Sequence, residues 1–210
     1  MVGRMWSVTS SLRADAGLDL DDAKQVLRES VRAHRRDRSE RERRDAAQRI
    51  AENVEDLLDG VRRVATYASR PTEPDTSVLM AHLHAAGIEI LLPVLGPGLS
   101  RDWAVYRPGD ALEVRAPGRP PEPEGPVLGA DALGEADLIL APALSVDSEG
   151  TRLGQGGGWY DRALRHAKDD AKVFAIVFDD EVSAERLPLA DHDRPVDGVI
   201  TPSGWWLIER

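Results

Sequence analysis

Short apolar runs alternate along most of the chain with segments whose apolar residues recur at helical spacing. A run of four to eight apolar residues bounded by turn residues is typical of a buried strand, and helical spacing indicates a helix packed on one side. The runs that we expect to form strands are residues 61–67, 88–95, 138–140 and 172–178, with shorter edge strands at 103–106 and 112–114. The segments that we expect to form crossing helices are residues 78–86 and 161–168. Strands that alternate with helices favour an α/β fold, a single three-layer domain with a largely parallel central sheet.

Two further helices are predicted before the first strand. Asp19 or Asp21 is a candidate N-cap for the first, and the second begins near Ser39 and carries an apolar stripe that ends at Gly60. The segment 35–44 between them is rich in arginine and glutamate, which favours a solvated helix surface.

Composition narrows the class of protein. A chain of 210 residues is long enough for one core, so we expect residues 19–210 to form a single domain, preceded by a loose tail at residues 1–18. The absence of cysteine excludes disulfides and thiolate chemistry. No apolar run approaches the roughly 20 residues that span a bilayer, and no signal-peptide pattern opens the chain. We therefore expect a cytoplasmic protein without a membrane partner.

The net charge of −10 argues against nucleic acid as a partner. An acidic protein that binds an anionic ligand must gather its few cations at one place. Lys24 and Arg28 are four residues apart and so share one face of the first predicted helix. Taken alone, the pair is most simply interpreted as two exposed cations on a helix.

The most informative stretch is residues 150–162, where four glycines fall within five residues. A predicted strand precedes this loop and a predicted helix follows it, an arrangement that points backbone N–H groups at an anion. Arg152 and Arg162 flank the loop, and Asp161 is a candidate ligand for the magnesium ion of a nucleoside triphosphate. The loop lacks the lysine of a P-loop and the glycine spacing of a dinucleotide site. A flexible surface turn is the alternative interpretation.

The order of residues in this stretch is more specific than its glycine content. Arg-Leu-Gly-Gln-Gly-Gly-Gly-Trp-Tyr-Asp-Arg at 152–162, preceded by a strand and Ala-Pro-Ala-Leu at 141–144, resembles the signature of the 5-formyltetrahydrofolate cyclo-ligase family, also called methenyltetrahydrofolate synthetases. The family has tyrosine or phenylalanine where this chain has Trp159. A second stretch, 187–201, resembles the end of the family's sequence.

The resemblance implies ATP-dependent cyclisation of 5-formyltetrahydrofolate to 5,10-methenyltetrahydrofolate, with release of ADP and phosphate. It implies ATP and the folate as ligands and Mg²⁺ as the cofactor, in a monomer or weak dimer. It assigns catalytic roles to Arg152 and Tyr160, and a metal role to Asp161 and Asp193. The residues that it assigns to ATP are Lys24, Arg28, Arg152, Leu153, Gly154, Gln155, Gly156, Gly157, Gly158, Trp159 and Tyr160.

The resemblance also assigns Ala68 and Glu73 to the folate. Glu73 follows a predicted parallel strand, and open α/β sheets place ligands at the carboxyl ends of such strands. From the residues alone, a solvated loop carboxylate is the simpler interpretation of Glu73. The acidic triplet at 179–181 is likewise interpreted as a solvated helix start, with a metal role as the alternative.

Three departures from the family pattern leave the substrate open. Ala190 stands where the family has glutamate, Trp159 replaces a tyrosine or phenylalanine, and residues 119–123 read Arg-Pro-Pro-Glu-Pro where the family has Gly-Ile-Pro-Glu-Pro. These differences permit two alternatives. One is a family paralogue that acts on another small molecule, and the other is a module that binds nucleotide or folate without turnover.

Overall fold

A seven-stranded sheet forms the centre of the protein, in the order β12-β11-β9-β6-β1-β2-β3. The structure is a computed structural model that describes residues 19–95, 100–115, 119–190 and 193–209, so the predicted tail at 1–18 lies outside the described residues. The strands are β1 Arg63–Ala65, β2 Glu89–Leu95, β3 Arg101–Tyr106, β6 Leu138–Pro142, β9 Lys172–Ile176, β11 Gly198–Thr201 and β12 Gly204–Leu207. The five inner strands are parallel, and the edge strands β3 and β12 are antiparallel to their neighbours. The predicted largely parallel sheet is confirmed.

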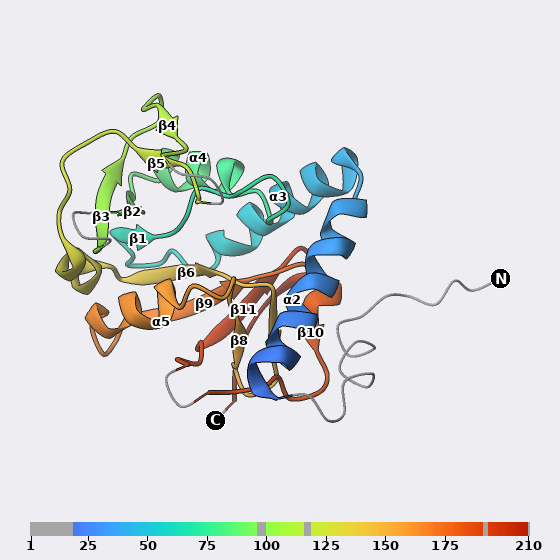
Figure 1. Ribbon diagram of the computed structural model, residues 1–210. Helices are drawn as coiled ribbons and strands as arrows, with labels where there is room; N and C mark the ends of the chain where they lie inside the picture. The colour runs from blue at the N-terminus through green and yellow to red at the C-terminus, as the bar shows by residue number, and fades with distance from the viewer. Residues whose placement is uncertain (1–18, 96–99, 116–118, 191–192, 210) are drawn as a thin grey trace.

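Helices cover both faces of this sheet (Figure 1). One face carries α3 Glu40–Glu55 and α4 Ser77–Ala85, and the other carries α5 Trp159–Ala163 with the 3₁₀ turns η2 Ala130–Glu135 and η3 Leu164–His166. The helix α2 Leu20–Asp37 packs in a separate apolar cluster with Leu144, Leu153 and Leu187, and a third 3₁₀ turn, η4 Asp179–Glu181, follows β9. Successive residues of a strand point to opposite faces. Val64 therefore packs in the apolar cluster beneath α3 and α4, whereas the adjacent Ala65 packs in the cluster that contains α5, η2 and η3. The result is the predicted three-layer arrangement.

The first two helices begin where the sequence predicts. Asp19 caps α2, since its carboxylate accepts hydrogen bonds from two backbone N–H groups of the first turn. Ser39 and Glu42 form a capping box at the start of α3. The predicted end of this second helix is wrong: α3 stops at Glu55, and turn residues lead to Gly60, which has a φ of +73°.

The interpretation of the 35–44 segment as a solvated surface is wrong at Arg35. Its side chain is fully buried and forms an ion pair with Glu181 of η4. The interpretation of residues 179–181 as a solvated helix start is wrong for the same reason, because Glu181 is also fully buried. The pair joins α2 to the loop that follows β9.

The connection around the glycine loop differs from the predicted strand–loop–helix order. Two short strands, β7 Ser145–Asp147 and β8 Arg152–Leu153, lie between β6 and the loop. They form a small sheet in which β7 pairs with β8 on one side and with β10 Val182–Ser183 on the other. The helix after the loop begins at Trp159 rather than Asp161 and continues as η3.

A separate small sheet joins β4 Leu112–Glu113 to β5 Glu122–Pro123. In the described part of the chain, no helix is both long and apolar enough to cross a membrane.

Candidate active site

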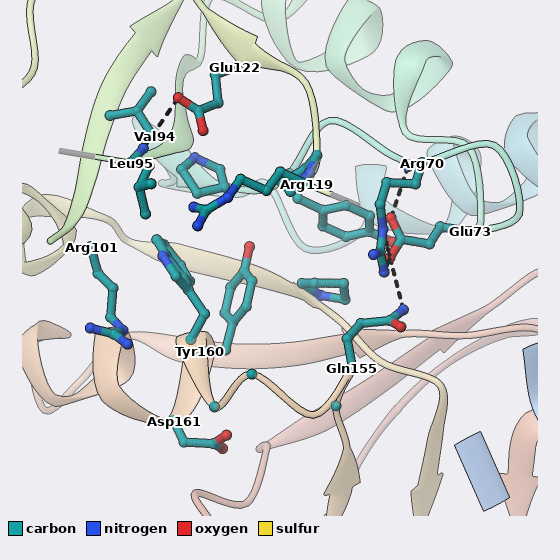
Figure 2. A pocket seen from close by; sticks show the side chains of 18 of the residues that line it. Arg70, Glu73, Val94, Leu95, Arg101, Arg119, Glu122, Gln155, Tyr160 and Asp161 are labelled. Atoms are coloured by element: carbon teal, nitrogen blue, oxygen red, sulfur yellow. Dashed lines mark hydrogen bonds and ion pairs between the residues drawn. The ribbon is translucent and has the colours of Figure 1, made fainter. Parts of the chain in front are cut away.

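A cavity of about 570 Å³ opens at the carboxyl ends of neighbouring parallel strands. Tyr67 after β1, Leu95 of β2 and Pro142 of β6 all contribute to its wall. The glycine loop forms the side of the cavity below Tyr160 in Figure 2. The cavity therefore lies where an open α/β sheet is expected to bind its ligand.

Cations from α2 hold the glycine loop from one side. The Arg28 Nε donates to the carbonyl oxygen of Gly154 at 3.0 Å, and the Arg32 Nη2 donates to the backbone oxygen and the Oε1 of Gln155, each at 3.0 Å. Lys24 forms an ion pair with Asp193 at 2.5 Å. The three cations are spaced by four residues along one face of α2. Arg32 was not among the predicted site residues, although its spacing from Lys24 and Arg28 is a signal that could have identified it.

Arg32 lies in a strongly positive environment. Burial lowers the pKa of its guanidinium, and the nearby charges of Arg70 and Arg28 lower this pKa further. Cations that repel one another beside a glycine loop are balanced best by a bound anion. The electrostatics of the loop thus favour a phosphate ligand.

Arg152 extends from β8 under the loop toward α5. Its side chain is almost fully buried, its Nη2 lies 2.7 Å from the Asp161 carboxylate, and its guanidinium carbon is 5.7 Å from the centre of the Tyr160 ring. The Arg152 Nε is buried and has no hydrogen-bond partner among the described residues. A donor left unpaired at a cavity wall is available to a ligand.

Two tyrosine hydroxyl groups in the cavity wall also have no protein partner. The hydroxyls of Tyr67 and Tyr160 are buried, and neither forms a hydrogen bond with a described residue. Burial raises the pKa of both phenols far above the physiological range, and Arg152 only partly opposes this effect at Tyr160. Both groups are therefore neutral donors. Tyr67 was not predicted as a site residue because it ends a predicted strand, next to residues that belong to the core such as Val64 and Ala65.

Glu73 is part of the wall and not a solvated loop carboxylate. Its side chain is only 5% exposed. It accepts hydrogen bonds from the backbone and guanidinium of Arg70 and, at 3.0 Å, from the amide of Gln155 (Figure 2). These contacts connect the loop after β1 to the glycine loop. Ala68 packs in the apolar core beside Tyr67 and does not line the cavity in the part of the chain that the structure describes.

The two candidate metal ligands come from segments that meet beside the cavity. The backbone N–H of Arg194, next to Asp193, donates to Asp161 at 3.4 Å. No group of three histidine or acidic side chains suited to a metal occurs among the described residues. Mg²⁺ commonly binds through one or two carboxylates together with substrate phosphates. Asp161 and Asp193 fit a magnesium ion that enters with a nucleotide, and the described residues alone offer no complete ligand set.

Comparison with known proteins identifies the family of the chain. The sequence profile of the 5-formyltetrahydrofolate cyclo-ligase family matches residues 21–202. The chain is 38% identical to the 5-formyltetrahydrofolate cyclo-ligase of Mycolicibacterium smegmatis over 86% of this chain and 94% of that protein. It is 34% identical to the Escherichia coli K12 protein of the same name over 68% of this chain and 79% of that protein.

Solved structures agree with the sequence relatives. The NMR structure of 5,10-methenyltetrahydrofolate synthetase from Aquifex aeolicus superposes with a TM-score of 0.75 at 30% identity, over 89% of this chain and 93% of that one. The Mycoplasma pneumoniae synthetase, at 17% identity and a TM-score of 0.67, shares the fold. On the profile match and these identities, the chain belongs to the 5-formyltetrahydrofolate cyclo-ligase family.

Proposed function

We propose that the protein uses ATP to cyclise 5-formyltetrahydrofolate to 5,10-methenyltetrahydrofolate, releasing ADP and phosphate. The observation that carries this proposal is the position of the glycine loop. Its backbone borders the same cavity as the Arg152 Nε and the hydroxyls of Tyr67 and Tyr160, none of which has a hydrogen-bond partner among the described residues. Groups suited to a phosphate and groups suited to a polar organic molecule thus line one cavity.

The proposed reaction proceeds in two steps. The formyl oxygen attacks the γ-phosphorus of ATP and ADP leaves, which forms an imidate phosphate. The N10 nitrogen then attacks the activated carbon, the ring closes and phosphate leaves. This chemistry depends on positioning and charge neutralisation more than on a dedicated protein nucleophile. A cavity lined by arginines, tyrosines and glycines, in a chain without cysteine, suits that requirement.

Each part of the site has a role in this scheme. Lys24, Arg28 and the loop from Arg152 to Tyr160 hold the nucleotide, and Arg152 neutralises charge that develops on the transferred phosphoryl group. The Tyr160 hydroxyl donates to a ligand oxygen. Glu73, fixed by Arg70 and Gln155, orients the pterin or the formyl group.

Magnesium belongs to this scheme as the partner of ATP. Asp161 and Asp193 would hold it together with the phosphates, where it would neutralise phosphate charge. Both carboxylates are already paired with cations, Asp161 with Arg152 and Asp193 with Lys24. These cations keep the carboxylates in place before the ligand arrives.

The test is the appearance of the methenyltetrahydrofolate absorbance band with purified protein, 5-formyltetrahydrofolate and Mg-ATP. We expect a rise that requires all three components. A flat trace with nucleotide binding intact would reject this substrate and favour the family paralogue, to which Trp159 and Arg119 in the cavity wall would then be adapted. A flat trace without nucleotide binding would reject the phosphate role of the glycine loop as well.

A further inference from the structure

The cations that line the cavity fall into two groups. Arg32, Arg70 and Arg152 hydrogen-bond to side chains of the glycine loop, Glu73 or Asp161. Arg101 and Arg119 form no hydrogen bond or ion pair through their side chains with any residue that the structure describes, and the Arg101 Nε is buried without a partner. The wall thus contains two arginines with unused donors.

These two arginines lie on the side of the cavity opposite Glu73. Figure 2 shows Arg101 and the head of Arg119 to one side of Tyr160, with Arg70, Glu73 and Gln155 on the other. Arg101 belongs to the edge strand β3, whereas the cations that hold the glycine loop come from α2. The two groups of cations therefore serve different parts of a bound molecule.

The protein holds Arg119 in this place through a neighbouring contact. The backbone N–H of Leu95, at the end of β2, donates to the buried carboxylate of Glu122 at 3.3 Å. Leu95 also pairs with Arg101 across the β2–β3 ladder. The contact joins the segment that carries Arg119 to the end of β2, which pairs with the strand that carries Arg101.

Electrostatics indicate an anion here as well. Burial lowers the pKa of Arg101, and the charge of Arg162 lowers this pKa further. The acidic lining residue on this side, Glu122, is already engaged by Leu95 and lies 3.8 Å from Arg115. A guanidinium group presents a planar fork of donors that matches a carboxylate. Two guanidinium groups on one side of the cavity, neither with a side-chain partner among the described residues, suit a ligand that carries carboxylates.

We propose that Arg101 and Arg119 form a subsite for the glutamyl carboxylates of the folate and so select substrates with an anionic tail. This inference rests on the proposed function, because it takes the folate as the molecule in the cavity. It places the pterin toward Glu73 and the tail toward β3. Position 119 is where the family pattern has glycine, so this part of the subsite is a feature of this chain.

The test compares two substrates in steady-state kinetics, 5-formyltetrahydrofolate and its analogue in which an uncharged amide replaces the glutamyl residue. For Arg119→Gln and Arg101→Gln we expect the KM for the folate to rise about tenfold, as the loss of a charge-assisted hydrogen bond implies. Their kcat, their KM for ATP and their KM for the amide should change little, because the tail is bound equally in ground and transition states. Arg119→Lys should recover part of the affinity.

Arg107→Gln is the matched control, since Arg107 follows β3 but is exposed and does not line the cavity. An equal rise in KM for both substrates, a rise in KM for ATP or no change at all would overturn the subsite. If the wild-type protein shows no turnover, the proposed function fails and calorimetric binding of the two ligands tests the subsite alone. A preference for the glutamyl ligand that Arg119→Gln abolishes would support it. Equal binding of both ligands, or binding of neither, would overturn it.

Discussion

Arg35 and Glu181, which are 146 positions apart in the chain, form a bidentate ion pair in the interior of the protein. The Arg35 Nε and Nη2 donate to the two carboxylate oxygens of Glu181, each at 2.7 Å, and Nη2 also donates to the carbonyl oxygen of Ala143. Burial alone would lower the pKa of Arg35, but Glu181 outweighs it and the pKa is raised. The pair fixes α2, which carries the cations of the glycine loop, against the sheet.

The first prediction concerns this pair. Arg35→Met leaves the Glu181 carboxylate buried without its partner, and we expect it to lower the free energy of unfolding by about 3–5 kcal/mol. Replacing both residues with apolar ones should cost less than this single change. Arg36→Met, at an exposed position of the same helix, should have little effect. Urea unfolding measures the free energy of unfolding of these three variants. A decrease below about 1 kcal/mol for Arg35→Met would contradict a structural role for the ion pair.

Tyr160→Phe separates ligand binding from stability. The Tyr160 hydroxyl has no partner among the described residues, so its removal should leave the melting temperature unchanged or slightly raised. Ligand affinity should fall about tenfold if the hydroxyl donates to the ligand. Titration calorimetry beside thermal unfolding gives both values. Tyr106→Phe, on β3 outside the cavity, is the control. Unchanged affinity in Tyr160→Phe would remove the hydroxyl from the site.

Arg152→Ala tests the proposed phosphoryl contact. We expect kcat/KM to fall by a factor of about 100 or more if Arg152 neutralises charge in the transition state. Since the same change leaves Asp161 without its partner, the melting temperature must be measured alongside the rate. Arg186→Gln, an exposed arginine paired with Glu149, is the control. Near wild-type turnover in a folded Arg152→Ala protein would exclude Arg152 from the mechanism.

A side chain at Gly156 in the glycine loop is expected to strain the backbone. Gly156 has a φ of +102°, and a Cβ there would lie 3.5 Å from the Arg28 guanidinium. Gly156→Ala should therefore lower the free energy of unfolding by about 1–2 kcal/mol and weaken ATP binding. At Gly157 an added Cβ meets nothing within 4 Å, and the φ is not positive. Gly157→Ala should keep the melting temperature of the wild type, and equal loss of stability in the two variants would refute the strain argument.

The Asp137 carboxylate should make the free energy of unfolding depend on pH. A hydrogen bond from Lys168, followed by backbone N–H groups of Arg62 and Arg63, lowers its pKa from 3.8 to about 2. Because the folded-state pKa lies below the unfolded one, the stabilisation is fully present above about pH 4 and is lost as the pH falls toward 2. It amounts to about 2 kcal/mol at most.

Chemical unfolding between pH 2 and pH 6 tests this dependence. The difference in unfolding free energy between wild type and Asp137→Asn should shrink as the pH falls through this window. Asp59→Asn, at an exposed position before β1, is the control and should follow the wild-type profile. A difference that stays constant with pH would mean that the Asp137 charge does not stabilise the fold.

Local chemistry in the sequence was enough to predict much of this protein. The starts of the first two helices, the buried strands and the order of residues around the glycine loop depend on contacts within a few positions of the chain. The family, the α/β class and the loop could therefore be identified from sequence. Glu73 lies in the cavity wall, where its place after a parallel strand and the family resemblance both pointed, and its contact with the folate stays a prediction.

The partners of buried charges were decided by tertiary structure. Arg35 and Arg36 are adjacent and chemically identical in the sequence, yet one is buried against Glu181 and the other is exposed. The same applies to the two unpaired tyrosine hydroxyls and to Arg101 and Arg119. A residue's type determines which interactions it is able to form, whereas the packing of distant segments determines which partners and how much water surround it. For this reason the sequence alone determined the chemistry available to the site, and only the folded chain decided which of those groups remain free for a ligand.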